Sequence, residues 1–239
     1  MDVLKVKNLC KSYPGFALNN VSFAVKKGTI MGFIGRNGAG KTTTLKSILN
    51  MVHTENGEIS FFDLDIKGNE KTIKQRTGYA GGAVDYYKKK RISHIINTTK
   101  RFYKNWDDGV CEHYLTLFSI DKNKTPSQLS QGMQVKLNLA VALSHRAELL
   151  ILDEPTSGLD PVSREELLEI FRYLKAQGVT ILFSTHITSD LDKVADDITY
   201  IREGSIVYTG DIREFAKGEN LEDVMVKYEK EHFREKFAL

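Results

Sequence analysis

The sequence has little cysteine and no long apolar run. Only two cysteines occur among the 239 residues, Cys10 and Cys111, and their spacing fits no metal-binding motif. Neither a disulfide nor a zinc site is therefore expected, and we expect reduced thiols in a cytosolic protein. No apolar run approaches the roughly 20 residues of a membrane-spanning helix. The opening residues MDVLKVKNLC lack the apolar core of a signal peptide, so secretion is not expected either.

A large excess of one charge is also missing. Lysine and arginine number 34 against 31 aspartates and glutamates, which gives a net charge of +3. Because polyanion binding needs many uncompensated basic residues, no nucleic-acid partner is expected. No internal repeat or low-complexity tract appears. The chain is long enough for a substantial core, as one large domain or one domain with an insertion.

Residues Gly35 to Thr42 read GRNGAGKT and fit the pattern G-x-x-x-x-G-K-[ST]. The preceding Thr29–Ile34 predicts a strand, and the following Thr43–Met51 predicts an amphipathic helix. Glycines let successive backbone N–H groups point at one anion, and the helix start adds its positive dipole end. Lys41 is expected to reach the β- and γ-phosphates, and Thr42 to offer its hydroxyl to Mg²⁺. We therefore predict nucleotide binding.

A second predicted strand ends in two carboxylates. The apolar run Leu149–Leu152 leads directly into Asp153 and Glu154. A buried parallel strand has this pattern where it reaches the edge of a site. Adjacent carboxylates there can divide the work, one holding a cation and the other activating a water. The segment alone also fits a strand and an ordinary acidic turn, and the phosphate loop favours the catalytic interpretation.

The order of predicted elements divides the chain into three regions. Short β patterns fill residues 1–80, helical patterns fill residues 84–145, and strands and helices alternate again from Leu149. Such alternation predicts a parallel sheet wound with helices, which the helical region interrupts. The predicted strands of the first region are Val3–Val6, Val21–Val25, Thr29–Ile34, Glu58–Phe62 and Thr77–Ala80.

The helical region ends in a capped helix. Residues 129–133 read LSQGM, and Ser130 is a good N-cap for the amphipathic stretch that follows. The serine hydroxyl and the backbone N–H of Gly132 could together contact an anion. This feature alone is weak, because every capped helix has these parts.

These segments together resemble the nucleotide-binding subunits of ABC transporters, over nearly the whole chain. LSQGM is similar to the family signature LSGGQ, and four further segments resemble family motifs. The resembling segments are Gly35–Thr42 for Walker A, Leu149–Glu154 for Walker B, Ser157–Asp160 for the D-loop and Ser184–His186 for the switch histidine segment. The phrases LSHRAELLILDEPTSGLDPV and FSTHITSDL are similar to bacterial ABC-2-type exporter ATPases.

The resemblance implies a fold and a division of the chain. The fold is an α/β P-loop NTPase core, a mostly parallel sheet wound with helices, with an antiparallel β subdomain and an inserted α-helical subdomain. Residues 1–239 form one ABC ATPase domain. Its core with the β subdomain covers residues 1–82 and 147–239, and its helical signature subdomain covers residues 83–146.

The resemblance also implies ATP hydrolysis with Mg²⁺. Asp153 and Thr42 would hold Mg²⁺, and Glu154 would be the general base. His186 would contact the γ-phosphate, the alternative being a lone surface histidine. The catalytic residues would thus be Glu154, His186 and Lys41. The expected ATP contacts are Tyr13, Gly35, Asn37, Gly38, Ala39, Gly40, Lys41, Thr42 and Thr43. Tyr13 would stack on adenine, although a tyrosine packed at a β-hairpin is an alternative interpretation.

Two subunits would be needed. Each ATP would lie between Walker A of one subunit and Ser130 and Gly132 of the other, with Asp160 at the dimer interface or, alternatively, in an exposed turn. The implied partners are a second ABC ATPase, identical or related, and a transmembrane permease. The chain would be peripheral on the inner face of the cell membrane and would drive an exporter. The alternatives are a soluble non-transport ABC ATPase and a weakly hydrolysing regulatory subunit.

Two motifs depart from the family pattern. Gln131 and Met133 stand where the signature usually has glycine and glutamine. A side chain at position 131 could crowd the partner's nucleotide or point away from it. Gly82 stands at the position of the usual Q-loop glutamine. The link between Mg²⁺ and the permease is then missing, replaced by water, or supplied by a residue such as Asp85.

Overall fold

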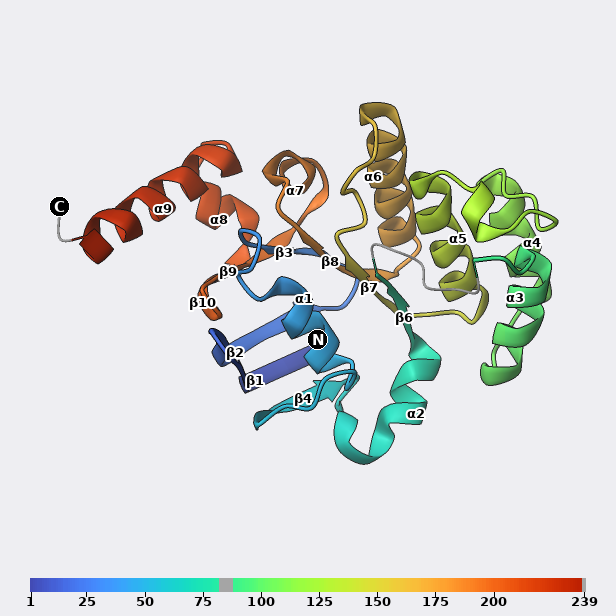
Figure 1. The fold of residues 1–239 in the computed structure, drawn as a ribbon, viewed down its shortest axis with the longest axis horizontal. Helices are drawn as coiled ribbons and strands as arrows, with labels where there is room; N and C mark the ends of the chain where they lie inside the picture. Colours follow the sequence, from blue (N-terminus) through green and yellow to red (C-terminus); the bar gives the residue numbers. More distant parts are fainter. Residues whose placement is uncertain (82–87, 238–239) are drawn as a thin grey trace.

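The computed structural model describes residues 1–81 and 88–237, which fold around two β-sheets (Figure 1). The larger sheet has six strands in the order β10-β9-β3-β8-β7-β6. The smaller sheet has four strands in the order β2-β1-β4-β5. An α/β core with an antiparallel β portion is thus confirmed.

The larger sheet is mostly parallel. Strands β3 (Ile30–Ile34), β7 (Leu149–Asp153) and β8 (Thr180–Thr185) are buried at every position, as expected for strands covered on both faces. The remaining strands are β6 (Thr77–Ala80), β9 (Asp197–Arg202) and β10 (Ser205–Asp211). Only the β9–β10 pair is antiparallel. Since β3, β7 and β8 run in parallel, their carboxyl ends meet at one edge of the sheet.

The smaller sheet is antiparallel throughout. Its strands are β1 (Asp2–Tyr13), β2 (Phe16–Lys26), β4 (Asn56–Phe61) and β5 (Leu64–Asp65). The first two are much longer than the predicted Val3–Val6 and Val21–Val25. Their outer halves are bulged and partly exposed, so the apolar alternation that marks a strand in sequence fades there.

The described helices follow the predicted alternation. Between β6 and β7 lie α3 (Ile92–Thr99), η1 (Lys100–Phe102), α4 (Asp108–Leu117), η2 (Pro126–Gln128) and α5 (Gln131–Ser144). The other helices are α1 (Lys41–Ile48), α2 (Ile66–Arg76), α6 (Pro161–Ala176), α7 (Thr188–Val194), α8 (Ile212–Ala216) and α9 (Leu221–Phe237). No helix in the described ranges is long and apolar enough to cross a bilayer.

Helix α2 is an element that the sequence did not predict. It is bent at Lys67 and Gly68, whose backbone angles are not helical, and only Ile66 and Ile73 are buried. A helix with so few buried positions has no apolar periodicity for sequence analysis to detect. Helix α1 begins at Lys41, two residues before the predicted Thr43, because Gly40 ends the preceding loop with φ +114°.

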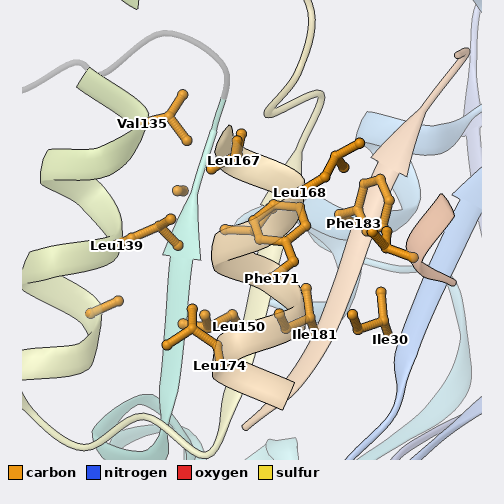
Figure 2. Close-up of a cluster of buried hydrophobic side chains, with 14 of the residues drawn as sticks. Ile30, Val135, Leu139, Leu150, Leu167, Leu168, Phe171, Leu174, Ile181 and Phe183 are labelled. Atoms are coloured by element: carbon orange, nitrogen blue, oxygen red, sulfur yellow. The ribbon is translucent and has the colours of Figure 1, made fainter. Parts of the chain in front are cut away.

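Two apolar clusters cover the two faces of the larger sheet. Leu150 and Phe183 point toward α5 and α6, and Leu149 and Leu182 point toward α1 and the smaller sheet. Figure 2 shows the first cluster, in which residues of α5 and α6 meet the strands. Each fully buried large apolar side chain contributes roughly 1.5–3 kcal/mol. Packing of these two clusters fixes the positions of β3, β7 and β8 within the sheet and therefore the position of their carboxyl ends.

Helix α5 is buried almost all round. Val135, Leu139, Ala142 and Leu143, the predicted apolar face, are all buried, and so are Leu137 and Ala140 on other sides. The helix therefore lies between α4, α6 and β6 rather than on the surface. The sequence predicted one apolar face on α5, whereas several of its faces are buried in the structure.

Candidate functional site

The loop between β3 and α1 has a backbone that requires glycine. Gly38 and Gly40 have φ angles of +81° and +114°, in the left-handed region. A Cβ at Gly40 would lie 2.8 Å from a Leu18 methyl, and a Cβ at Gly35 would lie 2.4 Å from the Ile201 carbonyl oxygen. The loop is thus packed closely against Leu18 and Ile201, and it bends sharply. This geometry presents successive N–H groups to a phosphate.

Lys41, the first residue of α1, is buried and paired. Its Nζ donates to the carbonyl oxygen of Gly35 at 2.7 Å and lies 3.1 Å from Oε1 of Glu154. The side chain is only 6% exposed, so an unpaired ammonium here would be strongly unfavourable. The loop and the end of β7 are therefore joined by a charge pair at the place where the two expected catalytic groups meet.

Asp153 lies at the end of β7 and is held by two hydroxyls. Its Oδ1 accepts a hydrogen bond from Oγ1 of Thr42 at 3.1 Å and another from Oγ of Ser184 at 2.6 Å. The carboxylate is buried, at 7% exposure. Thr42 and Asp153, the two expected Mg²⁺ ligands, thus face each other across the gap between the phosphate loop and β7.

Glu154 follows in a left-handed conformation, with φ +51°. Such a conformation is uncommon for a residue other than glycine, asparagine or aspartate and is a feature of functional sites. Its backbone N–H donates to Oγ of Ser184 at 2.9 Å, and its Oε2 lies 2.8 Å from Nδ1 of His186. The structure therefore brings Lys41, Glu154 and His186 into one cluster.

Tyr13 lies at the end of the β1–β2 hairpin, paired across it with Phe16. The side chain of Phe16 lies beside Gly40, so the hairpin end adjoins the phosphate loop. The tyrosine is 43% exposed, and Nζ of Lys11 lies 5.1 Å from its ring centre. Both expectations for Tyr13 fit this position, since it belongs to a hairpin and has ring surface free to stack on a base.

Ser130, Gly132 and Asp160 form a separate group. Ser130 caps α5, with Oγ accepting from the N–H of Met133 at 3.3 Å, and Asp160 caps α6 through the N–H groups of Val162 and Ser163. Hydrogen bonds from the Ser163 hydroxyl and N–H hold the pKa of Asp160 below its ordinary value. Figure 1 shows α5 and α1 well apart, on either side of β7.

A cavity of about 1140 Å³ adjoins the phosphate loop. It is lined by His186, by residues of α9 and by the loop residues Arg36, Asn37, Gly38 and Ala39. Arg36 and Glu229 of α9 approach to 3.6 Å across it. The C-terminal helix thus borders the proposed nucleotide site.

Similarity to known proteins decides the family. A model of the family described as ABC transporter matches residues 18–157. Over 241 aligned residues the chain is 35% identical to the lantibiotic transport ATP-binding protein SrtF of Streptococcus pyogenes, with 93% of this chain and 95% of that protein covered. The chain belongs to the ABC transporter family.

Two further relatives place this ABC transporter chain among the ATP-binding subunits. It is 35% identical over 211 residues to the bacitracin transport ATP-binding protein BcrA of Bacillus licheniformis, covering 86% of this chain and 68% of that protein. A solved ATP-binding subunit of an ABC transporter is 26% identical, with a TM-score of 0.84, 94% of this chain and 98% of that chain covered. The protein is therefore an ATP-binding subunit and an ATPase, and its fold is the ABC ATPase fold.

Ser184 is a site residue to which the sequence assigned no role. It belongs to the switch histidine segment, and its buried hydroxyl contacts both Asp153 and the N–H of Glu154. The available signal was a polar residue near the carboxyl end of the apolar run ILF. That signal becomes specific only when β8 is known to lie beside β7.

The two positions considered for the Q-loop fall outside the structural description. Gly82 and Asp85 both lie outside the described residues. The other departure, Gln131, is described. Its side chain is directed toward the D-loop of its own chain, because Nε2 donates to the carbonyl oxygen of Ser157 at 2.8 Å.

Proposed function

We propose that this ATPase works in a bacterial exporter, paired with a second ABC ATPase subunit around two ATP molecules and driving a separate transmembrane permease. The observation that carries the catalytic part is the cluster of Lys41, Glu154 and His186 at the carboxyl end of the parallel sheet. The exporter assignment rests on relatives named for lantibiotic and bacitracin transport. Antimicrobial peptides are the first class of substrate to test.

The proposed reaction begins with an exchange of partners at Lys41. The ammonium now pairs with Glu154, and the β- and γ-phosphates of ATP offer it a more highly charged partner. The loop N–H groups and the start of α1 bind the same phosphates. The contacts assigned to ATP are Gly35, Asn37, Gly38, Ala39, Gly40, Lys41, Thr42 and Thr43, with Tyr13 against the adenine. Phosphate binding therefore releases Oε1 of Glu154.

Glu154 then acts as the general base. It accepts a proton from a water molecule whose oxygen bonds to the γ-phosphorus as the bond from that phosphorus to the β–γ bridging oxygen breaks. ADP carries away the electron pair of the broken bond, and inorganic phosphate is released. His186 orients the carboxylate through the contact between Nδ1 and Oε2. The left-handed backbone at Glu154 directs the side chain toward both partners.

The residues present fit a magnesium ion. Thr42 and Asp153 would hold it, and their oxygens already lie 3.1 Å apart. Proteins bind Mg²⁺ through one or two oxygen ligands together with substrate phosphates and water, and Thr42 and Asp153 supply two such oxygens. When bound, Mg²⁺ neutralises charge that develops on the phosphate oxygens.

The second subunit would supply Ser130, Gly132 and Asp160. Within one chain these residues are grouped around the starts of α5 and α6, away from α1 (Figure 1). A head-to-tail pair places this group of one subunit over the phosphate loop of the other. We also propose residues 1–82 and 147–239 as the core and residues 83–146 as the signature subdomain, with the subunit peripheral on the inner membrane face.

The test is Glu154→Gln. Glutamine keeps the size of the side chain and cannot accept the proton, so turnover should fall by about 10²–10⁴-fold. ATP binding should persist, and a dimer with bound ATP should accumulate, which size-exclusion chromatography with light scattering measures. Glu58→Gln makes the same chemical change at an exposed position on β4 and should retain turnover. Undiminished hydrolysis in Glu154→Gln would show that another group is the base.

The alternative of a weakly hydrolysing regulatory subunit is favoured by two sequence features, the altered signature LSQGM and Gly82 at the position of the Q-loop glutamine. The same assay separates the two functions. An active subunit hydrolyses ATP, either alone or with its related partner, and Glu154→Gln abolishes this hydrolysis. A regulatory subunit binds ATP and dimerises, and its partner's glutamate alone controls turnover.

A further inference from the structure

Gln131 occupies the first position of α5 and reaches across to the D-loop. Its Nε2 donates to the carbonyl oxygen of Ser157 at 2.8 Å. Its Oε1 lies 2.7 Å from the place where a Cβ would stand on Gly158. Gly158 has φ +71° and carries no side chain, so the amide group of Gln131 lies close against its backbone. The two residues fit each other, and a side chain on Gly158 would displace the amide.

Neighbouring contacts join the same two elements. Gly132 faces Leu159 and Ser163, whose side-chain atoms would lie 3.5–3.7 Å from a Cβ on this glycine. One turn further along α5, Nζ of Lys136 lies 2.6 Å from Oε2 of Glu166 in α6. The start of α5 is therefore packed against the D-loop and the start of α6, and the Gln131–Ser157 hydrogen bond lies at the outer edge of this contact.

The D-loop is held at its end, where Leu159 is buried and Asp160 caps α6, but its internal backbone hydrogen bonds are long. The N–H of Ser157 donates to the carbonyl oxygen of Glu154 at 3.2 Å, and the N–H of Leu159 donates to the carbonyl oxygen of Thr156 at 3.3 Å. Both distances are at the long end for backbone hydrogen bonds. The bond from Gln131 is shorter than either, so it makes a substantial contribution to fixing this loop.

We propose that Gln131 is a positioning residue that holds the D-loop in register with the signature helix of the same chain. Ser130 and Gly132 on one element and Asp160 on the other are thereby presented as a single surface. This rests on the proposed function, in which that surface contacts the partner's ATP. Glutamine, which is unusual at this position, then neither obstructs the nucleotide nor is a neutral replacement for the usual glycine.

Two variants remove the donor with little change in size. Gln131→Met has no donor, and Gln131→Glu in addition places a carboxylate beside the carbonyl of Ser157. Gln177→Glu repeats the second change at the exposed far end of α6 and is the matched control. In the purified subunit, backbone hydrogen exchange over residues 156–160 should become about 2- to 10-fold faster in both Gln131 variants, the range that corresponds to one hydrogen bond.

Steady-state ATPase assays supply the functional measurement. The turnover number should fall by about 2- to 10-fold in both Gln131 variants. The affinity of the single subunit for a fluorescent ATP analogue should stay at the wild-type value, because Lys41 and its loop are untouched. A substitution that only loosened the fold would alter both the turnover number and the ATP affinity. Reduced turnover with unchanged affinity therefore identifies a positioning role.

Each other result overturns a part of the proposal. Unchanged exchange over residues 156–160 would show that Gln131 does not hold the loop. Reduced turnover with unchanged exchange would mean that Gln131 touches the nucleotide directly. Faster exchange with wild-type turnover would show that the contact does not contribute to catalysis. A wild-type subunit that neither dimerises nor hydrolyses would instead refute the proposed function, and the exchange measurement would still decide whether the loop is held.

Discussion

Single residues at the end of β7 show how a site is built from ordinary hydrogen bonds. Ser184 lies on β8 directly opposite Asp153 in the parallel register. Its hydroxyl donates to that carboxylate and accepts from the N–H of Glu154, so one buried group orients both acidic residues. The left-handed conformation of Glu154 is stabilised by this bond and by the contacts to Lys41 and His186.

Ser184→Ala should therefore damage both stability and turnover. The substitution removes the hydroxyl acceptor of the half-buried Glu154 N–H, which keeps only the carbonyl oxygen of residue 184, and it leaves the buried Asp153 with one donor fewer. Loss of a partner for buried polar groups costs about 1–3 kcal/mol, to be measured by urea unfolding. Turnover should fall by about tenfold or more at saturating ATP, because Glu154, the proposed general base, is displaced. Ser184→Cys, with a weaker donor of similar shape, should be intermediate, and equal effects of both variants would contradict this account.

At the scale of elements, α5 connects the helical region to the core. Its C-cap His145 is 2% exposed, stacks on Tyr103 with ring centres 3.8 Å apart, and has Nδ1 3.2 Å from the carbonyl oxygen of Gln75. These contacts join α5 to the residue after η1 and to the end of α2. Burial lowers the pKa of His145 below its ordinary value of 6.5.

This predicts a loss of stability in mild acid. Below about pH 6.5 the unfolded His145 gains a proton while the folded one stays neutral, so protonation favours unfolding. The contribution is fully present above pH 6.5 and decreases as the pH falls through the folded pKa. Its slope is at most about 1.4 kcal/mol per pH unit.

Urea unfolding between pH 7.5 and pH 5 measures this slope. His145→Gln should lower it, whatever the variant's own stability at pH 7.5, since the titrating group is gone. His113→Gln, at an exposed position of α4, is the control and should keep the wild-type slope. An unaltered slope in His145→Gln would assign the acid sensitivity to other groups.

At the scale of the whole molecule, the site of one chain is incomplete in the proposed reaction. Lys41 and Glu154 lie together, whereas Ser130 and Gly132 belong to the start of α5, a helix on the other side of β7 from α1. A head-to-tail dimer resolves this separation, because each subunit then supplies one half of each site.

Mixing two inactive variants tests that arrangement. Lys41→Ala removes the proposed phosphate ligand, and Gly132→Asp places a carboxylate where the partner's γ-phosphate would lie. The nearest atoms to a Cβ at Gly132 are 3.5–3.7 Å away, ordinary contacts, so the fold should accept the added Cβ. In a mixed dimer one of the two sites carries neither change, and ATPase activity should rise well above that of either variant alone.

The control is each variant alone at the same total concentration. Absence of any gain, with each variant folded by circular dichroism, would contradict a dimer of identical chains and point to a related second subunit. Activity of Lys41→Ala alone would contradict the assigned role of the lysine.

The sequence alone was enough to predict the proposed chemistry. The glycine pattern of residues 35–42, the apolar run into Asp153 and Glu154, and the alternation of strands and helices are local features. They can be recognised because each depends on neighbouring residues along the chain, through backbone freedom or side-chain periodicity. The wound α/β sheet followed from the alternation, and the family with its antiparallel portion followed from the resemblance of these and further motifs; both were confirmed.

The tertiary structure decided which residues meet. The Thr42–Asp153 contact spans 111 residues, Ser184 reaches Asp153 across 31, and Gln131 reaches Ser157 across 26. No local pattern records such pairs, because they arise from the register of parallel strands and from the packing of α5 on α6. The kinked α2 and the burial of α5 on several sides were not predictable for the same reason. The side chains of a segment set which chemistry it can take part in, and packing sets which other segments it contacts.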